Sequence, residues 1–289
     1  MASLKEIKNR IASIKSTQKI TAAMKMVSSA KLHHTQAATE RTLAYSAQLS
    51  GILHSLLSAE AEMDSPYTVS REVKNVAIVV CSSNTGLCGS FNANVWKALE
   101  EVIHSYEKQN VKMQFYPVGK KIAKELENAG YVYNAEFVGL ADHLSYAEAS
   151  KLATCLQELF VAGEVDKVDL LYHHYKNMVQ QILMHPTYLP LSLAEVQESG
   201  TTSGYAVDYI LEPSVEQLQQ LLFPKMLNLQ IYTALLDTTT AEHAARMMAM
   251  QTANDNANDL IQDLTLQYNK TRQQAITNEL LDIVGGMSK

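Results

Sequence analysis

The sequence predicts an α/β protein in which two long terminal helices, paired as an antiparallel coiled coil, flank an inserted Rossmann-like, mostly parallel α/β domain. Three observations predict this architecture. Both ends of the chain hold long stretches almost free of helix breakers, each stretch carries a narrow apolar seam, and short β-rich runs alternate with helical runs between them. The predicted division is residues 1–65 for the N-terminal helix, 66–212 for the α/β domain and 213–289 for the C-terminal helix.

The N-terminal helix is predicted to begin at Ser3-Leu4-Lys5-Glu6, a capping box whose serine and glutamate side chains bind free amides of the first turn. Nothing breaks the pattern strongly before Pro66, and Gly51 costs the helix about 1 kcal/mol. Apolar residues then recur at spacings of three and four, which places a seam on one face of the helix. The seam residues are Leu4, Ile7, Ile11 and Ile14.

The middle of the chain changes to short β-rich runs. The first four alternate with helical stretches at residues 92–108, 120–129 and 146–162, a βαβ rhythm that predicts a mostly parallel sheet. Residues 190–204 are typical of a mobile loop. The predicted strands are Asn75–Val80, Lys112–Val118, Tyr131–Val138, Lys167–Tyr175, Ile182–Tyr188 and Ala206–Leu211.

The C-terminal helix is predicted to begin with a second capping box at Ser214 and to end at Gly285-Gly286. Pro224, its one proline, should kink or interrupt the early part. As one helix this stretch would measure about 107 Å, roughly twice the ~50 Å width of a compact globule of this length. We therefore expect it to act partly outside its own core, against partners.

The same stretch carries a coiled-coil seam with a 3-4 rhythm, formed by Met247, Met250, Asn254, Ala257, Ile261, Leu264 and Tyr268. Its polar member, Asn254, could fix the register of the pair at some cost in stability. The methionines at 24, 26, 247, 248 and 250 suit a surface that repacks against changing neighbours. Ordinary coiled-coil packing explains them as well and is the favoured interpretation.

The composition, with 47% hydrophobic and 19% charged residues, is that of a foldable soluble chain. Its net charge of −6 argues against a general nucleic-acid binder, yet residues 1–31 hold seven basic residues against Glu6 alone. This basic helix could be a solvated face, a nucleic-acid arm or a surface for an acidic protein. The nucleic-acid arm is disfavoured because no aromatic residue precedes Tyr45, so the acidic protein is the better functional interpretation.

Cysteine usage and hydropathy predict a cytosolic protein. Cys81, Cys88 and Cys155 form no CxxC pair and give no disulfide framework, so we expect three free thiols in a reducing compartment. No apolar run reaches the ~18 residues of a membrane span, and nothing resembles a signal peptide. Any membrane attachment is expected to come through a partner.

The strongest enzymatic candidate is the glycine-containing turn Cys81–Asn92, placed between the first predicted strand and a helix, where α/β folds often bind phosphate. It lacks the GxGxxG and Gly-Lys-Ser/Thr patterns, and Ser90 occupies the position where a nucleophile elbow needs glycine. A tight structural turn is therefore favoured over a catalytic or nucleotide site. The histidine pairs 33–34 and 173–174 diverge on either kind of element, so we expect no metal site. We also expect no cofactor.

The two ends and one internal turn match a known pattern. The matching residues are Leu4–Ile11, Thr17–Val27 with Ala30–Leu32, Gly86–Gly89 with Phe91-Asn92, Glu242–Met247 through Asp255–Ala257, and Tyr268–Gln273 to Ile283-Val284. Over its whole length the chain closely resembles the γ subunit of F-type ATP synthases, most specifically at both ends. It departs from the family at Asn254, where threonine is common, and at Asn278, where glutamine or lysine is common.

The resemblance implies a central-stalk rotor of the bacterial type. The paired helices would turn inside a hexamer of α and β subunits, while the α/β domain would sit with the ε subunit on a membrane ring of c subunits. Ion (proton) flow would thereby be coupled to ATP synthesis or hydrolysis at the β subunits, with no catalytic site in this chain. The complex would lie peripherally on the cytoplasmic face of the bacterial inner membrane.

The resemblance also implies specific contacts. Arg272 and Gln273 match positions that contact a loop of a β subunit, and Thr277 and Glu279 match positions that affect coupling. Met24 and Lys25 match a region near an acidic loop of β, with Arg246 nearby on the C-terminal helix. Two alternatives remain: an α/β enzyme that uses the Cys81–Asn92 turn and oligomerises through its helices, and a passive scaffold.

Overall fold

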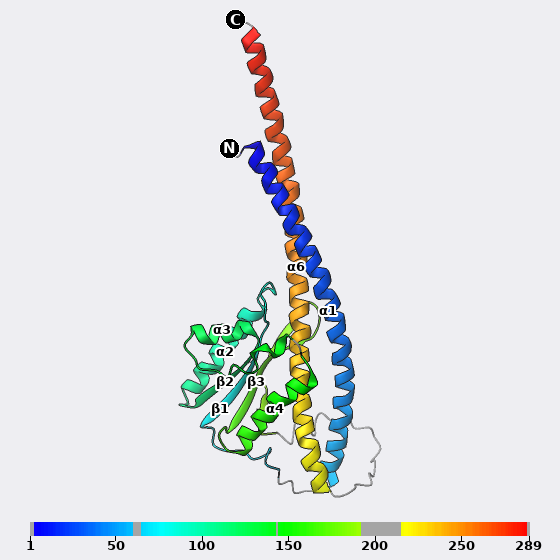
Figure 1. The fold of residues 1–289 in the computed structure, drawn as a ribbon, viewed down its shortest axis with the longest axis vertical. Coiled ribbons are helices and arrows are strands. Elements are labelled where there is room, and N and C mark those ends of the chain that lie inside the picture. Colours follow the sequence, from blue (N-terminus) through cyan, green and yellow to red (C-terminus); the bar gives the residue numbers. More distant parts are fainter. Residues whose placement is uncertain (1–2, 60–64, 143, 192–214, 288–289) are drawn as a thin grey trace. The chain divides into compact units, whose positions relative to one another are not determined.

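The computed structural model describes residues 3–59, 65–142, 144–191 and 215–287. The chain divides into two compact units, one made of Met1–Ala30 with Arg246–Lys289 (the terminal unit) and the other of Lys31–Ala245 (the sheet unit). The two long helices, α1 (Leu4–Ala59) and α6 (Val215–Met287), contribute to both units (Figure 1). The predicted fold class, a mostly parallel sheet with long terminal helices, is confirmed.

The start of α1 is the predicted capping box. The Ser3 amide donates to Oε2 of Glu6 at 2.8 Å, and the Glu6 amide donates to the Ser3 hydroxyl at 3.3 Å. The helix then continues without interruption through Gly51 to Ala59, since a single glycine weakens a helix without breaking its hydrogen-bond ladder. Local side-chain chemistry therefore determines where this helix begins.

The sheet has the strand order β2-β1-β3-β4, and β5 pairs with β3. The three predicted central strands are confirmed as β1 (Asn75–Cys81), β2 (Lys112–Val118) and β3 (Lys167–Tyr175), and β1 runs parallel to both neighbours. The short strands β4 (Gln181–Met184) and β5 (Thr187–Leu189) pair with β3 in the antiparallel sense.

Two strand predictions are wrong. Residues 131–138 form only an isolated bridge between Tyr133 and Phe115, followed by the 3-10 helix η1 (Val138–Ala141). The reason is a local turn in which Oδ1 of Asn134 accepts the amide of Glu136 at 2.9 Å, a side-chain bond that competes with strand pairing.

The other error lies at residues 182–188, which form two strands rather than one. Pro186 separates β4 from β5, and proline has no amide to donate to a sheet ladder. Its carbonyl still accepts the amide of Leu170 at 3.0 Å, which holds the break against β3. The predicted strand at 206–211, most of the predicted loop at 190–204 and Ser214 lie outside the described residues.

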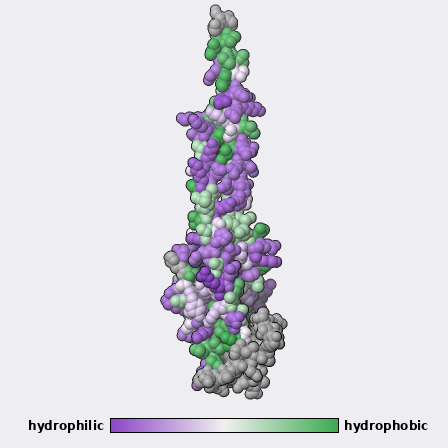
Figure 2. Space-filling view, turned by 90° about the vertical axis from the view of Figure 1, so that its right-hand side faces the viewer, coloured by the Kyte–Doolittle hydropathy of each residue, from purple (hydrophilic) through white to green (hydrophobic). Residues whose placement is uncertain are grey.

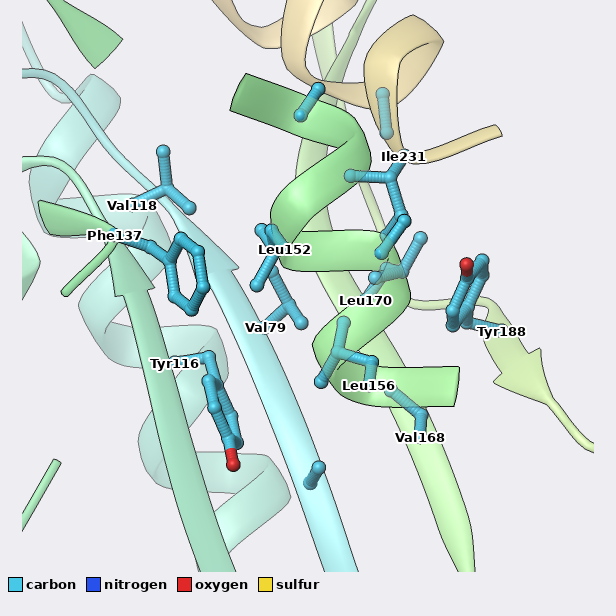
Figure 3. Packing of buried hydrophobic residues seen from close by; sticks show 14 of the residues in the cluster. Val79, Tyr116, Val118, Phe137, Leu152, Leu156, Val168, Leu170, Tyr188 and Ile231 are labelled. Carbon is cyan, nitrogen blue, oxygen red and sulfur yellow. The ribbon is translucent and has the colours of Figure 1, made fainter. Parts of the chain in front are cut away.

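Helices cover both faces of the sheet. Successive β1 side chains point to opposite sides, and since nearly all of them are apolar, both faces need a covering layer. On one face, α2 (Phe91–Glu107) and α3 (Lys120–Asn128) bury Val76, Ile78 and Val80. On the other, α4 (Tyr146–Val161) and α6 pack over Ala77, Val79 and Cys81. Figure 3 shows this second face, with Leu152 and Leu156 of α4 against the sheet and Ile231 of α6 beside them.

The end of α6 differs from the prediction. The helix passes through Gly285-Gly286 to Met287, because glycine keeps its amide and costs a helix only about 1 kcal/mol. Pro224 lies inside α6 and does not interrupt it. Within the described residues, no helix combines the length and the apolar character needed to cross a bilayer.

Candidate partner-binding surface

The seven residues predicted to contact partners all fall in the terminal unit. Met24 and Lys25 lie on α1, and Arg246, Arg272, Gln273, Thr277 and Glu279 lie on α6. None of the seven predicted contact residues belongs to the sheet unit. It does not bring all seven together, since α6 carries them in two groups, at 246 and at 272–279.

The predicted seam of α6 is confirmed by burial. Met247, Met250, Ala257 and Leu264 are buried, and the remaining seam residues are half-buried. On α1, Ile7 is 3% exposed, whereas Leu4, Ile11 and Ile14 are half-buried. In Figure 1 the two helices run side by side in opposite directions in this unit.

Asn254 takes part in a polar chain that crosses from α6 to α1. The side-chain nitrogen Nδ2 of Asn258 donates to Oδ1 of Asn254 at 3.4 Å, and Oδ1 of Asn258 accepts a hydrogen bond from Nε2 of Gln18 on α1. The link is exposed, and its two bonds form together only in one alignment of the two helices. Asn254 can therefore influence the register indirectly, through its bond to Asn258.

The predicted contact group formed by Met24, Lys25 and Arg246 is less exposed than the sequence suggests. Met24 and Lys25 are half-buried, and Arg246 is only 9% exposed. The outward positions hold other apolar side chains instead: Ile20 is 57% exposed, Met26 70% and Val27 57%. Sequence reasoning missed Ile20 and Val27 as surface candidates. A sequence signal for them exists. The seam of α1 continues with polar residues at positions 18, 21, 25 and 28, so the apolar residues Ile20 and Val27 lie off the seam, on the outward side of the helix.

The contact group near the end of α6 is open. Arg272, Gln273, Thr277 and Glu279 are all exposed, and the Thr277 hydroxyl donates back to the carbonyl of Gln273 at 2.9 Å. Large apolar side chains are exposed on the same turns, and Figure 2 shows this end of α6 as a green, apolar surface. We call these residues the α6 tip: Ile276, Leu280, Leu281, Ile283 and Val284. A contiguous exposed apolar surface marks an interaction site.

Charge is divided between the two helices of the terminal unit. The exposed side chains of α1 include Lys5, Lys8, Arg10, Lys15 and Lys19. The exposed side chains of α6 include Asp255, Asp259 and Asp263, spaced four residues apart on one helical face. This polarity favours an acidic partner opposite α1.

The rival site, the turn between β1 and α2, is bonded largely to itself. Oδ1 of Asn92 accepts the amide of Ser83 at 3.1 Å, and its Nδ2 donates to Sγ of Cys88 at 3.1 Å. Cys88 is 2% exposed and packs against Phe91 and Ala241. Burial also raises the pKa of Cys81, at the end of β1, to about 12, so that thiol is a poor nucleophile. These contacts favour a structural turn.

No group of three metal-ligating side chains converges among the residues that the structure describes. The two histidines at the end of β3 have other surroundings. His173 is 2% exposed and stacks on the ring of Phe91, with centroids 4.1 Å apart. Nδ1 of His174 lies 2.6 Å from a carboxylate oxygen of Asp237 on α6.

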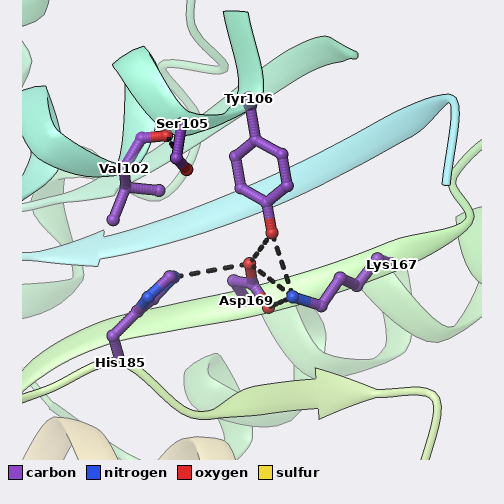
Figure 4. Close-up of polar contacts among 6 residues, drawn as sticks. All are labelled: Val102, Ser105, Tyr106, Lys167, Asp169 and His185. Carbon is purple, nitrogen blue, oxygen red and sulfur yellow. Dashed lines mark hydrogen bonds and ion pairs between the residues drawn. The ribbon is translucent and has the colours of Figure 1, made fainter. Parts of the chain in front are cut away.

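Titratable groups do gather at one place on the α2 side of the sheet, around Asp169 of β3 (Figure 4). The Tyr106 hydroxyl donates to its carboxylate, Nζ of Lys167 lies 3.0 Å from Oδ1, and Nε2 of His185 lies 3.4 Å from Oδ2. Burial alone would raise the pKa of the Asp169 carboxyl, but the bonds from His185, Tyr106 and Lys167 hold it below its usual value.

This Asp169 cluster links α2, β3 and the β4–β5 connection, and its groups bond to one another. Sequence reasoning missed it. The signal was one acidic residue inside the Val-Asp-Leu-Leu run of a central strand, where a parallel sheet ordinarily shows a continuous apolar run. We interpret the cluster as structural.

Comparison with known proteins gives a consistent result. A family model described as ATP synthase matches residues 3–288. The ATP synthase gamma chain of Parabacteroides distasonis is 65% identical over 286 residues, which cover 99% of this chain and 98% of the relative. The ATP synthase gamma chain of Bacteroides fragilis is 53% identical over 287 residues, with 99% of both chains covered.

Solved structures agree in fold. A chain from the rotor of the Euglena gracilis mitochondrial ATP synthase superposes with a TM-score of 0.61 at 22% identity, covering 94% of this chain and 98% of that one. A chain from the central stalk and c-ring of the Tetrahymena thermophila mitochondrial ATP synthase gives a TM-score of 0.59 at 22% identity, with 81% and 99% covered.

Proposed function

Because the chain belongs to the ATP synthase gamma-chain family, we propose that it is the central-stalk rotor that turns within a hexamer of α and β subunits. The observation that carries the proposal is the α6 tip, an exposed apolar helix end with Arg272, Gln273, Thr277 and Glu279 on the same turns. An exposed apolar helix end of this kind suits a bearing surface inside a ring of partner subunits.

In this mechanism the terminal unit acts as an asymmetric shaft. Ion flow turns a membrane ring of c subunits together with this chain, and the shaft presses each β subunit in turn through its open and closed states. Sites far apart are thereby coupled through a rigid element whose orientation each of them biases. ADP and phosphate bind, react and leave as ATP in the hexamer, and this chain supplies no catalytic group.

Each predicted contact residue has a role in this proposal. Arg272 and Gln273 contact a loop of a β subunit, and Thr277 and Glu279 support coupling. Met24 and Lys25 lie near an acidic loop of β, a pairing that the basic side chains of α1 favour by charge. Since Arg246 is almost buried, its proposed contribution is to position the neighbouring α1 surface rather than to reach far into the partner.

The α/β domain is proposed to bind the ε subunit and the c ring. The chain would then be peripheral on the cytoplasmic face of a bacterial inner membrane and would reach the membrane through the c ring alone.

The test compares ATP hydrolysis by the purified chain, by α and β subunits together, and by the three combined, with rotation of a bead on the α/β domain as a second readout. We expect no hydrolysis by the chain alone and rotation only in the combined complex. Hydrolysis by the chain alone would support an enzyme, and multisite hydrolysis without rotation would support a passive scaffold. Either result would contradict the proposal.

A further inference from the structure

The end of β3 is bonded to both long helices at one place in the sheet unit. Four residues make this contact, and we call it the β3 joint: His174 and Tyr175 at the end of β3, Asp237 on α6 and Gln36 on α1. Apolar packing between sheet and helices continues elsewhere, but here the contacts are directional hydrogen bonds.

Asp237 is the centre of the joint. One carboxylate oxygen, Oδ2, lies 2.6 Å from Nδ1 of His174, and the other, Oδ1, accepts the backbone amide of Tyr175 at 2.7 Å. Asp237 is 9% exposed, whereas the side chain of His174 is 48% exposed. Bonds to a carboxylate are short and strong, and the use of both oxygens fixes the orientation of the side chain.

Tyr175 carries the connection onward to α1. Its hydroxyl accepts Nε2 of Gln36 at 2.9 Å, so two consecutive residues of β3 bind α6 and α1. About one turn further along each helix, the hydroxyls of Thr39 and Thr240 lie 3.5 Å apart. The strand end and the helix pair therefore form one bonded group.

Elsewhere α6 meets the sheet layers through apolar packing and through a second directional bond, from Nε2 of Gln157 on α4 to Oδ1 of Asn228 at 2.9 Å. Leu227, Ile231, Ala234 and Leu235 pack into the apolar core on the α4 side. Apolar packing resists separation of the helix from the sheet, yet it is non-directional and specifies the rotational orientation of the helix less sharply than a hydrogen bond does. A carboxylate with two fixed donors on the strand opposes that rotation directly.

We propose that Asp237 is a positioning residue that sets the rotational orientation of α6 against the α/β domain, so that torque passes between them with little slack. The inference rests on the proposed rotor function, but the joint itself is a property of the isolated chain. Asp237 stands in a buried run, Leu-Leu-Asp-Thr-Thr-Thr, where a carboxylate is costly unless it is hydrogen-bonded.

The first test uses hydrogen exchange of the Tyr175 amide in the isolated full-length chain. Asp237→Ala removes the acceptor, and we expect exchange at this amide to be at least tenfold faster. Asp237→Asn keeps an oxygen at the same place, so its effect should be clearly smaller. Glu148→Gln, which breaks an exposed ion pair with Lys151 on α4, is the matched control and should change nothing at Tyr175. Unchanged exchange in Asp237→Ala would overturn the joint.

The second test measures torque transmission in complexes assembled with α and β subunits. With a bead on the α/β domain, thermal angular fluctuations during catalytic pauses should be wider for Asp237→Ala than for the wild type and Glu148→Gln, and intermediate for Asp237→Asn. A purely structural role would lower the yield of folded complexes without widening these fluctuations. Equal widths in all four complexes would overturn the positioning role. A wild-type complex that does not rotate would contradict the rotor function while leaving the hydrogen-exchange result in place.

Discussion

The two compact units use the same helix, α6, in opposite ways. In the sheet unit α6 buries Phe223, Leu227, Leu229 and Ile231, each at 5% exposure or less. In the terminal unit it leaves Leu266 70% exposed and Leu281 64% exposed. Burial of a large apolar side chain stabilises the fold by about 1.5–3 kcal/mol, so these four buried side chains stabilise the first unit, whereas the two exposed leucines of the second are available to partners.

The largest expected effect lies in the sheet unit. Phe160 of α4 is fully buried beneath the guanidinium of Arg71, which lies 5.3 Å from its ring centroid. Phe160→Ala should lower the free energy of unfolding by about 3–5 kcal/mol, because it removes apolar contacts and leaves a cavity. Urea denaturation of the full chain checks this value. A loss below about 1 kcal/mol would show that this core is not packed as the structure shows.

The next effect is a loss of stability in acid through His173. Burial lowers the pKa of His173 from 6.5 to about 4. Between pH 6.5 and pH 4, His173 is therefore protonated in the unfolded chain but neutral in the folded chain. Stability is therefore unaffected above pH 6.5 and falls by about 3 kcal/mol as the pH drops to 4. Urea midpoints measured across this range test the prediction.

His173→Phe is the matched variant for that titration. It keeps a ring against Phe91 and has no proton to gain, so its stability should fall less steeply between pH 6.5 and 4. Equal slopes for the variant and the wild type would mean that His173 is not the group responsible.

A smaller effect is expected in the Asp169 cluster. Tyr106→Phe removes the hydroxyl that donates to the Asp169 carboxylate and should lower the free energy of unfolding by about 2 kcal/mol. Tyr131→Phe removes an exposed bond to Glu107 of 3.2 Å and serves as the control, with a loss below about 0.5 kcal/mol. If the two variants lost equal stability, the cluster would contribute no more than a surface bond.

The terminal unit should respond in function rather than in stability. Leu281→Ser at the α6 tip should change the free energy of unfolding by less than about 0.5 kcal/mol, because the side chain is already exposed. In the assembled complex the same change should reduce the torque measured on a bead. A loss above about 1 kcal/mol in the free energy of unfolding would show that the tip contributes to the stability of the fold. It would contradict this difference between the two units.

The smallest structural change concerns Met24. Met24→Lys adds a cation beside Lys25 and, with an acidic partner loop at about 4 Å, adds about 1–4 kcal/mol of attraction. We expect fewer protons pumped per ATP hydrolysed, since part of each rotation works against this attraction. An unchanged ratio would argue against the contact.

The features that sequence predicted well are those set by near neighbours in the chain. The Ser3–Glu6 capping box and the 3-4 seam of α6 depend on residues three or four apart, and both appear as expected. The long C-terminal helix is also predicted from sequence, apart from its continuity at Pro224 and its passage through Gly285-Gly286.

What sequence missed depends on distant partners or on competing local bonds. The buried carboxylate of Asp169 is bonded to Tyr106 and His185, and that of Asp237 to His174 and the Tyr175 amide. No local sequence pattern connects either aspartate with these partners. The failed strand at 131–138 is a case of competition, since the side chain of Asn134 binds the backbone that a ladder would need.

The central proposal is that the exposed end of α6 contacts a β subunit, whereas the part of α6 in the sheet unit is buried in the fold. The most direct measurement introduces Gln273→Cys, together with a cysteine in the facing loop of β, and follows ATP hydrolysis by the assembled complex before and after disulfide formation. We predict that the cross-link stops multisite hydrolysis and that reduction restores it. Unchanged hydrolysis with the cross-link complete would contradict the account.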